Sequence, residues 1–246
     1  MQLLIYPNYD DLSEFVATQL LNSIKTKPNA VLCLAAGETP LLTYQKWVKK
    51  LLAEKIDYHQ CTFIGLDEWV GIAPENAGSC HYFLQEHIFK PLKINQKNIF
   101  LFDALADDMQ QQCEKMNDII VQKGGIDLML VGVGMNGHIG FNEPGVAFNQ
   151  YAHVIDLDEK TQTVGQKYFN ENTPLSQGIT LGLQHFMEAK KVLVIANGVR
   201  KAEIVKRMLE ENVSPEIPAS IVKNHPQGIV AIDSDAGFLL KRREYP

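Results

Sequence analysis

Short apolar runs alternate with amphipathic stretches along most of the chain. Unbroken runs of roughly four to eight aliphatic residues are typical of parallel strands that are covered on both faces. Strands that alternate with helical patterns of about 10–15 residues predict βαβ units. The predicted strands are 30–37, 61–69, 98–103, 126–134, 191–198 and 227–233, and the predicted helices are 40–54, 79–89, 107–122, 158–170 and 199–210, with a short helix after the last strand.

This pattern is not interrupted by a linker rich in proline, glycine or serine, by a repeat or by a low-complexity segment. It therefore predicts one α/β domain over residues 1–246, in which a doubly wound, Rossmann-like and mostly parallel sheet carries helices on both faces. Ligands of such sheets bind outside the carboxyl ends of the strands. That rule selects the loops 35–40, 66–72 and 132–145 as candidate sites.

Composition and charge narrow the class of partner. The net charge of −6 argues against nucleic-acid binding and membrane-surface binding, because both require basic surface. No apolar run reaches the roughly 18 residues that a membrane span needs. The start of the chain lacks the basic segment and long apolar core of an export signal, so we expect a cytoplasmic protein.

The four cysteines are scattered and form no CxxC pair. Without an export signal we expect them to be reduced thiols, with Cys33 in the core. Cys80 and His81 are adjacent, but no other ligand stands at a usual metal spacing, so no metal site is expected.

A glycine pattern after the most apolar run has the spacing of a dinucleotide site. Gly132, Gly134 and Gly137 match GxGxxG, but Pro144 and Gly145 break the helix that such a site requires. We therefore expect no nucleotide cofactor at this loop.

The loop 35–40, with the sequence AAGETP, joins a predicted strand to a predicted helix. Gly37 permits close approach of a backbone, Thr39 can cap the helix, and Pro40 suits the first helical position. Free N–H groups at a helix start bind anions, so this loop is a candidate phosphate site, although a capped helix alone would explain the same residues. Cations that could assist occur later in the chain, at Lys167, Arg200 and Lys201.

The segment LDEW (66–69) ends a predicted strand with two carboxylates. Asp67 and Glu68 face opposite sides of a strand, so only one of them can enter a given cleft. A carboxylate at the end of a strand can serve as a general base, and the alternative is a surface carboxylate or a cap.

The segment NGHIGFNEPG (136–145) supplies an imidazole and a further carboxylate. His138 can exchange a proton near neutral pH, and Glu143 can orient the ring and fix its tautomer. Asn136 can hold the ring or a sugar hydroxyl. No serine or cysteine stands nearby, which favours acid–base chemistry over covalent catalysis, whereas a structural histidine is the alternative.

Four segments together resemble the amino-sugar-6-phosphate deaminase/isomerase family. They are AGETPLLTY (36–44), LDEWVGI (66–72), GVGMNGHIGFNEPG (132–145) and IPAS…H (217–225). The resemblance runs from about residue 30 to about residue 233. It implies an open Rossmann-like sheet and an aldose–ketose isomerisation coupled to the loss of ammonia, without a metal or a redox cofactor.

The resemblance also implies roles for particular residues. Asp67 removes the proton at C2 of the open-chain sugar, His138 acts in ring opening, and Glu143 orients the ring or relays protons. Asn136 stands where some members have Asp, and because an amide cannot accept a proton, a relay must rest on His138 and Glu143. Lys167 stands where well-known members have Arg and would hold a phosphate without a bidentate fork. The implied phosphate-binding residues are Gly37, Glu38, Thr39, Lys167 and Lys201.

The identity of the sugar depends on weaker similarities. LLTY (41–44), Trp69 and KGGIDL (123–128) are closer to the galactosamine-6-phosphate branch, which predicts conversion of galactosamine 6-phosphate to tagatose 6-phosphate and ammonia. The alternative is glucosamine 6-phosphate, which would give fructose 6-phosphate. The two sugars differ in one hydroxyl at C4, and the sequence does not locate the hydrogen bonds that distinguish them.

Two rival functions stay open. A 6-phosphogluconolactonase shares the fold and the phosphate loop but has a DGHTAS-like segment, so Asn142 and Glu143 favour the deaminase. A catalytically silent sugar-phosphate sensor is the rival from another class, because Asn136 and Lys167 depart from the family pattern. In each case the expected partner is a small sugar phosphate, and the chain can also form a homo-oligomer without an obvious coiled coil.

Overall fold

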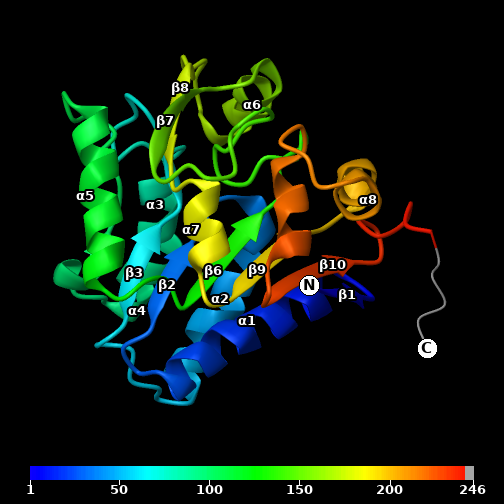
Figure 1. Ribbon diagram of the computed structural model, residues 1–246. Coiled ribbons are helices and arrows are strands. Elements are labelled where there is room, and N and C mark those ends of the chain that lie inside the picture. The colour runs from blue at the N-terminus through cyan, green and yellow to red at the C-terminus, as the bar shows by residue number, and fades with distance from the viewer. Residues whose placement is uncertain (242–246) are drawn as a thin grey trace.

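The computed structural model describes residues 1–241, and most of its strands assemble into one parallel sheet (Figure 1). The seven strands lie in the order β1-β10-β9-β6-β2-β3-β5, and every neighbouring pair is parallel. The predicted α/β fold with a mostly parallel sheet is thus confirmed. The strands are β1 (Gln2–Tyr6), β2 (Val31–Leu34), β3 (Thr62–Gly65), β5 (Ile99–Phe100), β6 (Leu128–Gly132), β9 (Val192–Ala196) and β10 (Gly228–Asp233).

Helices cover both faces of this sheet, because successive side chains of each strand point to opposite sides. Leu32 and Leu34 of β2 enter the core formed with α1 and α2, whereas Cys33 enters the core formed with α5, α7 and α8. Cys33 is therefore a core residue, as predicted. The helices are α1 (Tyr9–Thr26), α2 (Glu38–Ala53), α3 (Cys80–Leu84), α4 (Lys90–Leu92), α5 (Met109–Gln122), α6 (Glu159–Gly165), α7 (Leu183–Glu188) and α8 (Ala202–Glu210).

The order of the strands reverses between β2 and β6. From β2 the chain proceeds to β3 and β5 on one side, and it then returns to place β6 and β9 on the other side of β2. The loops that follow β2 and β6 consequently diverge and leave a crevice at the carboxyl ends of the strands. This is the edge of the sheet that the predicted loops share.

The single strand predicted over 61–69 is wrong, because the chain changes sheets at Leu66. The N–H of Leu66 donates to the carbonyl of Leu34 at 3.2 Å, and its carbonyl accepts the N–H of Leu181 at 2.9 Å. Leu66 thus ends the parallel ladder, and β4 (Asp67–Trp69) begins a second, antiparallel sheet in the order β4-β8-β7. Its other strands, β7 (His153–Asp156) and β8 (Gln177–Thr180), lie with α6 in the upper part of the view (Figure 1).

The first helix and first strand were not predicted. Strand β1 is a partly exposed strand at the edge of the sheet, and its apolar run is short, from Leu3 to Tyr6. Helix α1 is capped by Asn8, whose side chain accepts the N–H of Asp11 at 2.9 Å, and its buried stripe includes Leu12, Val16 and Leu20. In residues 1–241, no helix is both long and apolar enough to cross a membrane.

Other elements differ from their predicted bounds. The predicted helix 79–89 is broken by a π-helical turn at Gln85–Phe89 and continues to Leu92. The predicted strand 98–103 pairs only at Ile99–Phe100, and the predicted helix 199–210 begins with a 3-10 turn at Val199–Lys201. The short helix expected after the last strand is wrong as well, because residues 234–239 form turns.

Trp47 anchors α2, whose first turn reaches the crevice. Its indole is fully buried and packs between Tyr44 and Phe63, with ring centroids 6.5 Å from each. Trp47→Ala should lower the free energy of unfolding by about 3–5 kcal/mol, because it leaves a large cavity. Urea unfolding followed by circular dichroism measures the change. Leu52→Ala, on an exposed position of the same helix, is the control and should change stability by less than about 1 kcal/mol; equal losses in both variants would contradict this role of Trp47.

Candidate functional site

A cleft of about 210 Å³ opens where the loops after β2, β3, β6 and β9 converge. It lies at the point where the strand order reverses, which is where doubly wound sheets bind their ligands. Segments far apart in the sequence therefore share one cavity. The predicted site residues that line it are Gly37, Glu38, Thr39, Asp67, Asn136, His138, Lys167 and Lys201.

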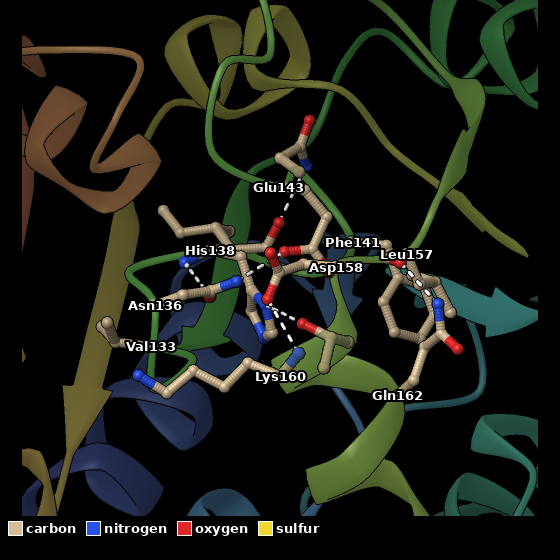
Figure 2. Close-up of polar contacts among 12 residues, drawn as sticks. Val133, Asn136, His138, Phe141, Glu143, Leu157, Asp158, Lys160 and Gln162 are labelled. Carbon is tan, nitrogen blue, oxygen red and sulfur yellow. Dashed lines mark hydrogen bonds and ion pairs between the residues drawn. The ribbon is translucent and has the colours of Figure 1, made fainter. Parts of the chain in front are cut away.

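His138 and Glu143 form the pair that the sequence predicted, and Figure 2 shows them pointing toward one another. The Nδ1 atom of His138 lies 3.3 Å from Oε2 of Glu143 and 3.1 Å from the hydroxyl of Thr161 on α6. The imidazole rests against Gly134, where a Cβ would lie 2.1 Å from Nε2. Absence of a side chain at this position thus makes the space for the ring.

Glu143 stands behind His138 with its side chain almost entirely buried. Burial alone would raise its pKa, but hydrogen bonds and the charge of His138, with Thr161 and Asn136, hold the pKa of Glu143 below its ordinary value. Glu143 is therefore an ionised partner that can stabilise a protonated imidazole.

Asn136 holds this pair by two hydrogen bonds. Its amide nitrogen donates to Oε2 of Glu143 at 2.8 Å, and its amide oxygen accepts the backbone N–H of His138 at 3.2 Å (Figure 2). An amide has no proton to exchange near neutral pH. The structure therefore gives Asn136 an orienting contact and leaves proton transfer to the imidazole and the carboxylate.

Asp67 enters the cleft from the first position of β4, on the opposite side of the strand from Glu68. Burial, followed by the negative charge of Glu68, raises the pKa of Asp67 to about 7, against a smaller lowering by the thiol of Cys80. A carboxyl group with a pKa near the working pH can both accept and return a proton. Its environment thus suits a general base.

The other end of the cleft is the start of α2. The helix begins at Glu38 with Gly37 as its N-cap, at φ 116°, so the prediction that Thr39 is the cap and Pro40 the first helical residue is wrong. A Cβ at Gly37 would lie 3.4 Å from the hydroxyl of Tyr168, on top of the strain of its backbone angle. The first N–H groups of α2 remain suited to an anion in the cleft.

Two lysines flank this helix start. Lys201 donates to the carbonyl of Val133 at 2.5 Å, and burial, with the nearby charge of Lys167, lowers its pKa to about 8. Lys167 is paired with the carboxylate of Glu38 at 2.6 Å. The carboxylate of Glu38 is thus paired with a lysine that a bound anion would also attract. Of Glu38, only the backbone N–H is suited to hold a phosphate.

Several residues in and around the cleft had no signal in the sequence. Thr161 and Tyr168 come from α6 and the turn that follows it, and Cys80 comes from α3. Their positions depend on how the second sheet packs over the first. Arg200 is exposed and is not among the residues that line the cleft. In the described part of the chain, no three His, Cys, Asp or Glu side chains are arranged to hold a metal ion.

Comparison with known proteins gives one consistent family. The model described as glucosamine-6-phosphate isomerases/6-phosphogluconolactonase matches residues 8–231. A glucosamine-6-phosphate deaminase of Clostridium perfringens (strain 13 / Type A) is 38% identical over 243 residues, which cover 98% of this chain and 100% of that protein. The solved structure of a monomeric glucosamine-6-phosphate deaminase aligns with a TM-score of 0.94 at 33% identity, over 97% of this chain and 100% of that one. A 6-phosphogluconolactonase from Trypanosoma brucei shares the fold, with a TM-score of 0.78 at 18% identity over 98% of each chain.

The raised pKa of Asp67 should make stability depend on pH. Its pKa is about 7 in the fold and about 3.9 in an unfolded chain, so ionisation between these values favours unfolding. Asp67→Asn should therefore unfold at a higher temperature than the wild type at pH 8, by the equivalent of about 1–3 kcal/mol, and this advantage should shrink toward pH 5. Thermal unfolding from pH 5 to pH 8 measures it. A constant difference across this range would mean that Asp67 titrates normally.

Proposed function

The chain belongs to the family of glucosamine-6-phosphate isomerases and 6-phosphogluconolactonases, and on that premise we propose that it deaminates a hexosamine 6-phosphate. The observation that carries the proposal is that Asp67 and His138 line one cleft that ends at the start of α2 beside Lys201. A base, an imidazole and an anion site in one cavity suit a small phosphorylated sugar. The names of the relatives at 38% and 33% identity support the same reaction.

The phosphate binds at the start of α2 in this proposal. The backbone N–H groups of Glu38 and Thr39 face it, and the ammonium of Lys201 neutralises part of its charge. Burial lowers the pKa of Lys201 to about 8, and a bound dianion would favour the charged form of this lysine. The phosphate therefore anchors the sugar with its other end toward Asp67 and His138.

His138 assists the opening of the pyranose by moving a proton between the C1 hydroxyl and the ring oxygen. Glu143 accepts a contact from Nδ1 and stabilises the imidazole when it carries the extra proton. Asn136 and Thr161 keep the ring and the carboxylate in this arrangement. The product of this step is the open-chain aldehyde with its amine at C2.

Asp67 then performs the isomerisation. Its carboxylate takes the proton from C2 while the carbonyl oxygen at C1 takes up a proton, which gives an enolamine. Asp67 then returns its proton to C1, which leaves an iminium group at C2. Water adds to C2 and ammonia leaves, so the hexosamine phosphate and water give a ketose phosphate and ammonia. A pKa of about 7 suits both the removal and the return of the proton.

The preferred epimer of the sugar is a separate part of the proposal. We propose glucosamine 6-phosphate, which gives fructose 6-phosphate, as the preferred substrate, because the relatives at 38% and 33% identity carry that name. The preference for galactosamine 6-phosphate, which gives tagatose 6-phosphate, stays a prediction from LLTY, Trp69 and KGGIDL. Both epimers release ammonia by the same steps, because they differ only at C4.

The purified protein should release ammonia from glucosamine 6-phosphate, measured in parallel with galactosamine 6-phosphate. Asp67→Asn should lower kcat by about 10²–10⁴-fold, because it removes the base that takes the C2 proton. Circular dichroism confirms that the variant is folded. Full activity in this variant would contradict the role of Asp67.

Hydrolysis of 6-phosphogluconolactone without ammonia release would favour the lactonase, and binding of sugar phosphate without any turnover would favour the sensor.

Glu38→Gln should lower KM for the sugar phosphate by about two- to five-fold and leave kcat nearly unchanged. The carboxylate competes with the phosphate for Lys167 and repels it, and exposed ion pairs of this kind are worth at most about 1 kcal/mol. Steady-state kinetics at low ionic strength measure the change. Glu54→Gln is the matched control, since Glu54 forms an exposed pair with Lys25 at the other end of the same helix. A rise in KM for Glu38→Gln would show that the acid aids binding.

A further inference from the structure

Glu68 is a buried carboxylate beside Asp67 that the proposed mechanism does not use. Only 3% of the residue is exposed, and its side chain lies on the far side of β4 from the cleft. A charged group in such a place is unfavourable unless it is well paired. Its partners should therefore explain why it is there.

The carboxylate of Glu68 accepts three backbone hydrogen bonds. Oε1 accepts the N–H of Trp69 at 2.9 Å and the N–H of Cys80 at 3.0 Å, and Oε2 accepts the N–H of His81 at 2.7 Å. Cys80 and His81 are the first two residues of α3, so the carboxylate sits at the positive end of this helix. Glu68 thereby ties β4, which carries Asp67, to α3, which carries the thiol of Cys80 into the cleft.

Three thiol and phenol groups that interact with Asp67 are neutral. They are Cys80 from α3, Cys33 from β2 and Tyr44 from α2, and burial raises the pKa of each of them well above its ordinary value. His138 and Lys201 line the same cleft. Among the described residues that raise the pKa of Asp67, Glu68 is the one with a negative charge.

We propose that Glu68 is a positioning residue for Asp67, which it serves by clamping β4 to the start of α3 and by placing a fixed negative charge behind the base. The proposal rests on the deaminase function only in calling Asp67 the base. Burial raises the pKa of Glu68 to about 6, and three N–H donors oppose this rise because they stabilise the charged form, so the carboxylate is ionised near neutral pH. That charge disfavours ionisation of Asp67, which keeps it basic enough to take a proton from carbon near neutral pH.

Glu68→Gln tests the charge while nearly preserving the shape. The acid limb of kcat/KM for glucosamine 6-phosphate should move to lower pH by about one unit, so the ratio of activity at pH 6 to activity at pH 8 should rise several-fold. Ser79→Ala is the matched control, because the Ser79 hydroxyl accepts the N–H of Tyr82 and caps the same helix without any charge. It should lower the unfolding temperature and leave the acid limb in place. An unmoved limb in Glu68→Gln, or the same shift in both variants, would overturn the proposal.

A second measurement uses the wild-type protein and needs neither turnover nor a folded variant of Glu68. Carbon-13 NMR of the Asp and Glu carboxyl groups follows both titrations, with the Asp67 signal assigned from Asp67→Asn. The carboxyl of Glu68 should remain ionised at a pH where Asp67 is already protonated. A protonated Glu68 beside an ionised Asp67 would overturn the proposal. Absence of ammonia release would contradict the proposed function but not the role of Glu68, because the NMR titration measures the protonation of Glu68 without turnover.

Discussion

The site depends on the reversal of strand order between β2 and β6. Parallel strands bring their carboxyl ends to one edge, and the reversal separates the two loops that follow β2 and β6 so that a crevice forms between them. The loop after β2 begins a helix, and the loop after β6 carries His138. The departure of the chain from the sheet at Leu66 adds Asp67 to the same edge. Three segments that are far apart in the sequence thus meet because of the strand reversal and the departure of the chain at Leu66.

Electrostatics divide the cleft into two ends. The start of α2 and the lysines Lys167 and Lys201 favour an anion, whereas the Asp67 end is acidic and poorly solvated. A hexosamine 6-phosphate has a matching polarity, with a dianion at one end and an amine at the other. The Glu38–Lys167 ion pair lies at the anion end, so a phosphate bound there as proposed would compete with Glu38 for Lys167.

Much of this arrangement was accessible from the sequence because burial on both faces leaves continuous apolar runs, and a general rule places ligands at the ends of such strands. The family, predicted from four motif segments, is confirmed by a family match over residues 8–231. Strand β4 could not be separated from β3, because hydrogen bonds of Leu66 to two different sheets leave no trace in residue type. The ion pair between Glu38 and Lys167 could not be predicted either, because it joins segments that are far apart in the sequence. Helix α1 did carry a signal in the sequence, in the Asn8 cap and in the spacing of Leu12 and Val16.

In the proposed function, one bound sugar phosphate contacts the anion end, Asp67 and His138 together. A crystal structure with a reduced, open-chain hexosamine 6-phosphate, which lacks the aldehyde and cannot react, tests it most directly. We expect the phosphate at the N–H groups of Glu38 and Thr39 beside Lys201, the carboxylate of Asp67 in contact with C2, and His138 at the C1 end. A phosphate bound elsewhere, or an Asp67 carboxylate that faces away from C2, would contradict it.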